Sequence, residues 1–366
     1  MAKAKKNIVD MDLFCSAKDA LQIEKSKSLL PLSPALDFRL GGGIPEGSLV
    51  LIQGKAKCGK TLSAVEIAAN ALKQGRYVFY FDTECRMTAS KYFTVDGFDI
   101  LNNPKFFLMN SESSKDGEII SGDKMYGMII QMMKMPKYKG SVYIVDSLSN
   151  VITQECLDDP EVTHARRDSS PKLNADFCKK VAPYIRKSNA ILVGIQHLQA
   201  SQNPQLHGAL EPIGGARLAY SSDIVLLSKH NPLDLNGDSI NSGFEKGAEG
   251  LDGLLVRYDL PYNKLLGPYV AKDKDEKIHN YYKFGKGCWK SREIIDVLNQ
   301  LGLINYGKSG WITFLTDKFT DKVQGAEKAA EIIDTDLDYF ESLLKNHYIE
   351  TYGVNYNFNP SDKEDE

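Results

Sequence analysis

The sequence predicts an α/β fold built on a doubly wound, mostly parallel sheet. From residue 48 onward, short apolar runs alternate with amphipathic stretches, as successive strand–helix–strand units do. The runs are apolar at nearly every position, which is typical of strands that are covered on both faces. The expected strands are 48–53, 77–82, 105–109, 141–146, 190–195 and 223–228.

Helices are expected between these strands. Residues 60–74 place Leu62, Val65 and Ala69 on one face and stop before Gly75, a residue type that commonly follows a helix. Further helices are expected at 122–134, 172–187 and 291–301.

The two ends of the chain differ from the middle. Residues 1–35 hold a helix-like piece at 10–22 and a connector, and we expect them to precede a core of residues 36–316. Residues 317–366 complete the chain as a small helical region with an acidic tail. Within the core, residues 231–253 are rich in Gly, Asn, Asp and Ser and predict a long loop. Strands are expected after it at 254–260 and 281–284, with another near 266–271.

Composition restricts the class of protein. Of the 366 residues, 42% are hydrophobic and 25% charged, which is ordinary for a soluble globular chain. No apolar run approaches the roughly 20 residues of a membrane-spanning helix, and the basic N-terminus lacks the hydrophobic stretch of a secretory signal. The six cysteines form no CxxC pair, which disfavours a zinc site or a disulfide framework. We expect a cytoplasmic protein in a reducing compartment, with no membrane partner.

Charge is distributed unevenly along the chain. Residues 317–366 hold 13 acids against 5 lysines, whereas the first 316 residues hold 35 acids against 40 bases. A mildly basic body with an acidic end indicates a nucleic-acid partner and a tail that competes with it. A solvated terminal helix with an acidic end explains the charge equally well.

One segment carries a strong signature for phosphate binding. Residues 54–61 read GKAKCGKT and match GxxxxGK[ST] between an expected strand and an expected helix. The glycines let the backbone N–H groups of the loop surround phosphates at the helix N-terminus. Lys60 is expected to reach the terminal phosphates and Thr61 to offer its hydroxyl to Mg²⁺. The expected nucleotide-contacting residues of this segment are Gly54, Lys55, Ala56, Lys57, Cys58, Gly59, Lys60, Thr61 and Leu62.

Acidic residues end two of the expected strands. Strand 141–146 ends in Asp146, the expected partner of Mg²⁺ or of its water ligands. Strand 77–82 leads into Glu84, and a carboxylate at that edge can polarise water for attack on a phosphate. Glu84 is therefore the candidate general base, with a solvated turn acid as the alternative.

Two polar loops follow strands at the same expected edge of the sheet. His197 stands at the head of a loop that runs to Gly214 and Gly215, where it can contact a γ-phosphate, although a lone histidine is often structural. The other loop, 147–172, suits a phosphodiester backbone, although basic loops are commonly just solvated. Its basic residues are Arg166, Arg167 and Lys172.

The order of these features resembles the RecA family of strand-exchange recombinases, with the phage UvsX type as the nearest. The segments LD and GGGIPEG, the phosphate loop and the triplets DTE, VDS and IQH follow one another in the family's order over residues 14–314. The resemblance implies a RecA-like P-loop ATPase core with ATP and Mg²⁺ as cofactors. It also implies single-stranded DNA and a homologous duplex as partners, self-assembly into helical filaments, and help from a mediator and a single-strand-binding protein.

The resemblance assigns roles to the residues that match the family's motifs. Lys60 and Thr61 match the phosphate-loop pair, and Asp146 matches the Mg²⁺-associated acid. Glu84 matches the glutamate that activates water. His197 matches the γ-phosphate-sensing position, which is Gln in bacterial RecA and His in the UvsX type.

Further residues match motifs outside this set. Tyr92 resembles the residue that stacks on adenine. Lys264 matches a lysine that reaches a neighbour's ATP, while the companion position holds Tyr262. Phe14 and Ala17 match the F-x-x-A polymerisation motif. The family's DNA loops correspond to 150–172 and to the loop that closes at ARLAY, so the expected DNA-binding residues are Arg166, Arg167, Lys172, Gln199, Gly214, Gly215 and Arg217.

The function implied by the resemblance is that of an ATP-dependent, DNA-stimulated recombinase. Such a protein pairs single-stranded DNA with a homologous duplex in recombination, repair and recombination-dependent replication. Lys264 would complete each ATP site from the adjacent protomer, next to Lys60 and Glu84. Two alternatives stay open: a hexameric helicase or another ring ATPase built on the same core, and a non-catalytic recombination mediator.

Overall fold

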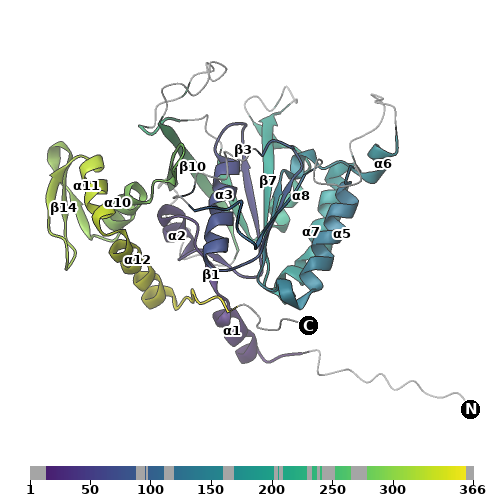
Figure 1. The fold of residues 1–366 in the computed structure, drawn as a ribbon, viewed down its shortest axis with the longest axis horizontal. Helices are drawn as coiled ribbons and strands as arrows, with labels where there is room; N and C mark the ends of the chain where they lie inside the picture. Colours follow the sequence, from purple (N-terminus) through teal and green to yellow (C-terminus); the bar gives the residue numbers. More distant parts are fainter. Residues whose placement is uncertain are drawn as a thin grey trace, which may run out of the picture.

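A computed structural model of the chain describes residues 14–87, 95, 98–110, 119–159, 169–201, 205, 209–228, 233–236, 240, 252–264 and 278–359. Its centre is a ten-stranded sheet in the order β12-β11-β10-β9-β3-β7-β6-β4-β5, with β8 paired to the end of β7. Figure 1 shows this sheet with helices on both faces and a smaller unit beside it.

The elements have the following bounds. The strands of the large sheet are β3 (Ser48–Gly54), β4 (Val78–Asp82), β5 (Phe106–Met109), β6 (Val142–Asp146), β7 (Ile191–Ala200), β8 (Leu210–Pro212), β9 (Ile224–Ser228), β10 (Gly253–Asn263), β11 (Ile278–Lys283) and β12 (Gly287–Cys288). Two smaller sheets consist of β1 (Leu29–Leu30) with β2 (Ile44–Pro45), and of β13 (Ile304–Tyr306), β14 (Trp311–Phe314) and β15 (Lys322–Gln324). The α-helices are α1 (Ala17–Ser26), α2 (Pro34–Leu40), α3 (Lys60–Lys73), α5 (Gly122–Lys134), α6 (Gln154–Leu157), α7 (Ser170–Ser188), α8 (Arg217–Ser221), α10 (Lys290–Gln300), α11 (Ala326–Thr335) and α12 (Leu337–Tyr352).

The large sheet is parallel from β5 to β9 and antiparallel from β9 to β12. Its side chains alternate between two hydrophobic layers, as the pleat requires. Val50 and Ile52 of β3 pack on the side of α2 and α3, whereas Leu49 and Leu51 pack on the side of α5 and α7. Both faces are therefore covered, and the predicted doubly wound, mostly parallel α/β core is confirmed.

All six predicted core strands are present, but β7 is longer than the sequence indicates. It continues to Ala200 because β8 pairs with its end in antiparallel register, Leu198 opposite Pro212 and Ala200 opposite Leu210. The two ends of the segment predicted as a loop after His197 therefore pair with each other as a β-hairpin.

The predicted helix at 10–22 is displaced along the chain. Helix α1 begins at Ala17, after the Ser16 side chain accepts a hydrogen bond from the backbone N–H of Asp19 at 3.1 Å. This N-cap fixes the start, so Phe14 is not helical, and the helix continues to Ser26. The strand expected near 266–271 lies outside the described residues.

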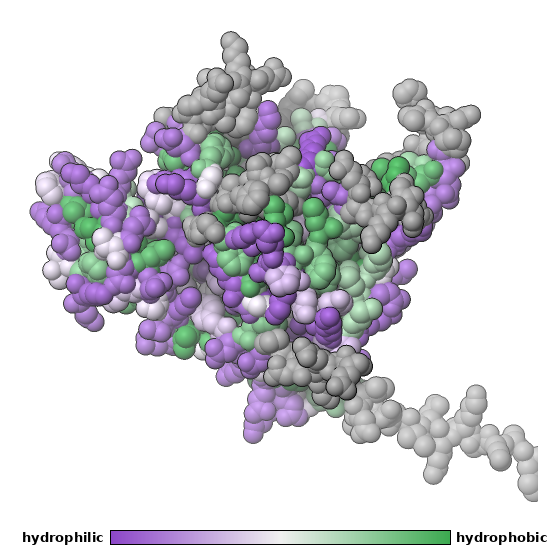
Figure 2. Space-filling view, viewed as in Figure 1, coloured by the Kyte–Doolittle hydropathy of each residue, from purple (hydrophilic) through white to green (hydrophobic). Residues whose placement is uncertain are grey.

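A second hydrophobic cluster forms the C-terminal unit. It joins α10, the three-stranded sheet, α11 and α12 around Leu298, Phe314 and Phe340. The boundary expected between residues 316 and 317 falls inside this unit, since β14 pairs with β15 through Ile312 and Val323. On the face seen in Figure 2 this unit, at the left, is mostly hydrophilic with hydrophobic residues scattered among the polar ones.

The end of the chain returns to the core as a strap, residues 354–359. Asn355 accepts a hydrogen bond from the backbone N–H of Leu29 at 2.7 Å, and the ring of Phe358 lies 3.9 Å from the guanidinium of Arg76. Arg76 is fully buried and forms an ion pair with Glu46 at 2.8 Å. Because Glu46 and Arg76 stand just before β3 and β4, the strap closes the amino-terminal edge of the sheet.

Two further observations bear on the class of protein. The described part of the chain contains no helix that is both long and apolar enough to cross a membrane. The six cysteines all lie in the described part and are free thiols, three of them buried.

Glu293 joins the core to the C-terminal unit. It lies in the first turn of α10 and is fully buried. Its carboxylate accepts hydrogen bonds from the backbone N–H groups of Ala35 at 3.1 Å and Tyr281 at 3.0 Å. Burial raises the pKa of Glu293 to about 7, although these donors and the nearby thiol of Cys288 act in the opposite direction.

We expect Glu293 to make the protein less stable as the pH rises from about 4.5 to about 7. The folded state holds the proton of Glu293 more tightly than the unfolded state does. Its favourable contribution to the free energy of unfolding is therefore complete at low pH and is lost as Glu293 loses that proton in the folded state. The free energy of unfolding of the wild type should fall, relative to Glu293→Gln, by on the order of 3 kcal/mol over this range. Urea denaturation at four pH values measures this free energy. Glu327→Gln, at an exposed position of α11, is the control. Parallel curves for wild type and Glu293→Gln would contradict the expectation.

Candidate active site

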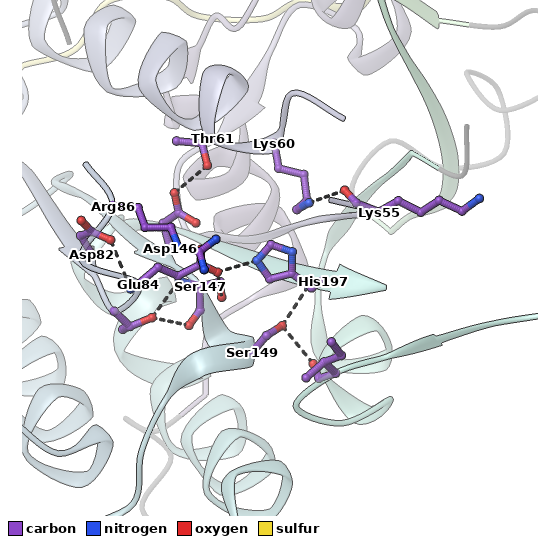
Figure 3. Close-up of polar contacts among 12 residues, drawn as sticks. Lys55, Lys60, Thr61, Asp82, Glu84, Arg86, Asp146, Ser147, Ser149 and His197 are labelled. Carbon is purple, nitrogen blue, oxygen red and sulfur yellow. Dashed lines mark hydrogen bonds and ion pairs between the residues drawn. The ribbon is translucent and has the colours of Figure 1, made fainter. Parts of the chain in front are cut away.

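The phosphate-binding loop links β3 to α3, as the sequence predicts. Gly59 precedes the first turn of α3 with φ +83°, and a Cβ at this position would lie 2.5 Å from Cγ2 of Val256. Only glycine avoids both the strain and the clash. The Lys60 ammonium is folded back over the loop, where it donates to the carbonyl oxygen of Lys55 at 2.6 Å (Figure 3).

Thr61 and Asp146 meet where β6 ends. The Thr61 hydroxyl donates to Oδ2 of Asp146 at 2.9 Å (Figure 3). The Tyr80 hydroxyl donates to the same oxygen at 2.8 Å. Burial raises the pKa of Asp146 despite these two donors. A cation beside this carboxylate would relieve the cost of its buried charge.

The donor set suits Mg²⁺ bound largely through a nucleotide. A hydroxyl and a carboxylate are oxygen ligands of the kind that Mg²⁺ prefers, and this ion commonly keeps waters and phosphate oxygens as its other ligands. Within the described ranges, no group of three or more His, Cys, Asp or Glu side chains is assembled as a metal site. Thr61 and Asp146 would therefore hold the ion together with phosphate oxygens and water.

Glu84 follows β4 and is held by three other side chains. His197 Nε2 lies 2.6 Å from Oε1 of Glu84, and the Ser147 hydroxyl donates to the same oxygen at 3.0 Å (Figure 3). The Arg86 guanidinium lies 3.5 Å from the other oxygen. Burial acts to raise the pKa of Glu84, but the hydrogen bonds from His197 and Ser147 and the charge of Arg86 outweigh it, so this pKa is lowered. The side chain is ionised at neutral pH, as a general base must be.

These groups line one cavity of about 370 Å³. The predicted nucleotide-contacting residues on its wall are Ala56, Lys57, Cys58, Gly59, Lys60, Thr61, Leu62, Glu84, Asp146 and His197. A larger hollow of about 800 Å³ lies beside β10, β11 and Trp289, but its wall includes no residue of the phosphate-binding loop. We therefore assign the nucleotide to the smaller cavity.

Several wall residues are not predicted from the sequence. Leu254 of β10 and Phe284, next to the hairpin between β11 and β12, reach the cavity from segments far along the chain. Arg86 and Met87 follow Glu84 and also line it. The run Phe284-Gly285-Lys286-Gly287 marks a tight turn, which is the only signal at Phe284 that the sequence offers.

Other predicted site residues lie outside the cavity wall. Lys264, after β10, donates from its ammonium to the carbonyl oxygen of Tyr220 in α8. Lys172 and Arg217 are exposed in the first turns of α7 and α8, and Gln199 is exposed near the end of β7. Gly54 and Lys55, also predicted to contact the nucleotide, are not part of the wall. The predicted positions Tyr92, Arg166 and Arg167 lie outside the described residues.

Two glycines follow the hairpin of β7 and β8. Gly214 and Gly215 have φ of +83° and +108°, a conformation that strains other residues. They connect β8 to α8 and bring the chain back beside Leu148, which follows β6, and to Gln196 of β7. The predicted turn at the end of the second loop is therefore built on glycine for a physical reason.

Residues 33–163 match the family model described as "ATPase: KaiC". This range contains the phosphate-binding loop, Glu84 and Asp146 together with the parallel strands that carry them. The chain carries a RecA-like P-loop ATPase core. The chemistry that such a core supports is ATP hydrolysis.

Two relatives match this chain over a much longer range than the family model does. Protein RecA of Streptococcus mutans serotype c is 22% identical over 329 residues, which cover 89% of this chain and 76% of the relative. Protein RecA of Rippkaea orientalis is 20% identical over 336 residues, covering 91% of this chain and 86% of the relative. Both alignments are long enough to span His197 and Lys264, so the similarity to these relatives extends beyond the segment that matches the family model.

In the RecA-like core, Glu84→Gln should strongly slow ATP hydrolysis while nucleotide still binds. Glutamine keeps the shape and an acceptor for Ser147 but cannot take a proton, so ATP hydrolysis should fall on the order of 10²-fold or more. Steady-state phosphate release measures turnover, and titration with a fluorescent ATP analogue measures binding. Glu155→Gln, an exposed acid in α6, serves as the matched control. Near wild-type hydrolysis by Glu84→Gln would remove Glu84 from the role of base.

Proposed function

We propose that this chain is an ATP-dependent DNA recombinase of the UvsX type. It forms filaments on single-stranded DNA and pairs that strand with a homologous duplex in recombination, repair and recombination-dependent replication. The observation that carries the proposal is the 2.6 Å contact between Glu84 and His197. It joins the candidate base for ATP hydrolysis to the strand that leads into the predicted DNA loop.

ATP and Mg²⁺ are the proposed cofactors. Lys60 contacts the terminal phosphates, while Thr61 and Asp146 hold the ion, which supplies charge neutralisation on the phosphates. Glu84 orients and deprotonates the attacking water, and His197 reports the γ-phosphate to the loop that follows it. Tyr92 is proposed to stack on the adenine.

Single-stranded DNA is proposed to lie across the carboxyl edge of the sheet. Lys172 and Arg217 are exposed cations in the first turns of two neighbouring helices, which suits contact with a phosphodiester backbone. Gln199 and the turn at Gly214 and Gly215 belong to the same edge. Arg166 and Arg167 complete the proposed DNA-binding set, and the homologous duplex, a mediator and a single-strand-binding protein are the further proposed partners.

Assembly into filaments is proposed to use the N-terminal segment and Lys264. None of the residues of α1 is buried, and Phe14 is 68% exposed, so this segment has apolar surface to offer a neighbour. Phe14 and Ala17 would anchor it there. Lys264 is exposed at the end of β10, where it can reach the ATP of an adjacent protomer and make hydrolysis depend on assembly.

The decisive test combines three measurements on the purified protein. ATP hydrolysis with and without single-stranded DNA tests for stimulation, and a strand-exchange assay with a homologous duplex tests for the recombinase reaction. Electron microscopy with ATP and single strands distinguishes open filaments from the closed rings of a helicase. Hydrolysis without strand exchange, with rings in the images, would reject the proposal in favour of a ring ATPase.

We expect Phe14→Glu to prevent assembly without unfolding the chain. The substitution would put a charge where an aromatic anchor must enter an apolar pocket of the neighbour, whereas in the monomer this position is exposed. Light scattering with ATP and without DNA should report monomers for this variant and larger species for the wild type. Leu21→Glu, on the exposed α1, tests whether the effect is specific to Phe14. Unchanged oligomers of Phe14→Glu would mean that this side chain has no part in assembly.

A further inference from the structure

The turn after β6, residues 147–149, connects the active site to the hairpin segment 198–213. We call these three residues the crosspiece. The Ser149 hydroxyl accepts a hydrogen bond from the backbone N–H of His197 at 2.9 Å and donates to the carbonyl oxygen of Ile213 at 3.2 Å (Figure 3). His197 directly precedes the hairpin segment and Ile213 is its last residue. One side chain therefore ties both of its ends to the turn after β6.

A buried amide reinforces this tie. Asn174 of α7 is fully buried and donates both of its amide hydrogens, to the carbonyl oxygens of Leu148 and Gly214, each at 3.0 Å. Its own oxygen accepts from the Tyr126 hydroxyl at 2.5 Å. Breaking any of these bonds would leave a polar group unpaired in the core, so the crosspiece and the turn at Gly214 are held together strongly.

A second buried amide fixes the exit of the hairpin segment to the sheet. Gln196 of β7 is fully buried and donates to the carbonyl oxygens of Ile213 and Gly215, each at 2.9 Å. Its oxygen accepts from the Gln53 amide of β3 at 2.7 Å. All three carbonyl oxygens of the turn 213–215 are therefore engaged, with that of Ile213 shared by Gln196 and Ser149.

The other end of the crosspiece reaches the candidate base. The Ser147 hydroxyl donates to Glu84 at 3.0 Å, and the backbone of Ser147 exchanges two hydrogen bonds with the Thr83 hydroxyl, at 2.7 and 2.9 Å. Leu148 between them is packed so closely on Gly194 that a Cβ there would lie 2.4 Å from a Leu148 methyl group. This close packing leaves the turn little room to shift between Ser147 and Ser149.

We propose that Ser149 is a positioning residue that couples the nucleotide state at Glu84 to the exit of the hairpin segment at 213–215. The direct contact between Glu84 and His197 reaches only the head of that segment, whereas Ser149 also holds its exit. The coupling rests on the proposed function in one respect, since the hairpin segment is a proposed DNA loop. Ser149 itself does not line the nucleotide cavity.

Hydrogen exchange of the full-length protein tests the coupling without DNA. Exchange of the peptide covering residues 209–215 is measured with and without Mg²⁺ and the slowly hydrolysed analogue ATPγS. In the wild type the analogue should slow this exchange. In Ser149→Ala that protection should fall about 5-fold, as expected for the loss of the hydrogen bond that holds Ile213, while the affinity for the analogue stays within about 2-fold of the wild type. Ser188→Ala is the matched control, because Ser188 is buried at the far end of α7 and bonds to Tyr184 in its own helix.

The outcomes separate this inference from the proposed function. Full protection in Ser149→Ala, or no effect of the analogue on residues 209–215 of the wild type, would overturn the coupling. ATP hydrolysis with and without single-stranded DNA forms the second arm, in which Ser149→Ala should keep the basal rate and lose the stimulation. A wild type that shows protection but no stimulation by DNA would reject the proposed function and leave the coupling supported.

Discussion

The parallel register of β3, β4, β6 and β7 fixes the geometry on which the whole site depends. Gly54 pairs with His197 and Asp82 with Asp146, so the phosphate-binding loop, Glu84, Asp146 and His197 all emerge at one edge of the sheet. Side chains alternate between faces along a strand, and a slip by one residue would therefore turn a functional side chain into the wrong layer. The two hydrophobic layers prevent such a slip because both faces of these strands are buried.

The two edges of the sheet differ in how their polar groups are used. At the amino-terminal edge, the buried guanidinium of Arg76 has its polar contacts satisfied by Glu46, Ser28 and the carbonyl oxygen of Gly140. At the carboxyl edge, Glu84 and Asp146 line a cavity that a nucleotide can enter. Burial lowers the pKa of Arg76, and the charge of Glu46 acts against that shift, as in a closed structural ion pair. The polar groups of the carboxyl edge are left open to ligands, which is the arrangement that parallel sheets use for binding.

The sequence predicts the site residues that follow the core strands closely. It misses those contributed by segments far along the chain. Asp146 ends an apolar run, Glu84 follows closely after another, and Lys60 and Thr61 belong to the GxxxxGK[ST] motif. Local pattern and motif therefore suffice to bring these four residues to one edge. Phe284 and Leu254 reach the cavity only because β10 and β11 continue the sheet beyond β9, and no local pattern reports that pairing.

The same distinction applies to the fold. The apolar core strands are predicted closely, whereas the extension of β7 depends on its pairing with β8, which is ten or more residues away. The start of α1 depends on a single side-chain hydrogen bond at Ser16, a detail finer than a helical pattern can locate. The long-range contacts of the buried amides Asn174 and Gln196 are likewise invisible in the sequence, because neither residue belongs to a recognisable motif.

The strap stabilises the edge of the sheet that lies opposite the candidate active site. Phe358 packs against Gly140, just before β6, and its ring covers the buried guanidinium of Arg76. The carbonyl oxygen of Asn355 accepts from the backbone of Leu29, so the strap also meets the segment that follows α1. No residue of the strap lines the nucleotide cavity at the carboxyl edge. Its contacts therefore hold the amino-terminal edge of the core closed and leave the carboxyl edge to the phosphate-binding loop, Glu84 and Asp146.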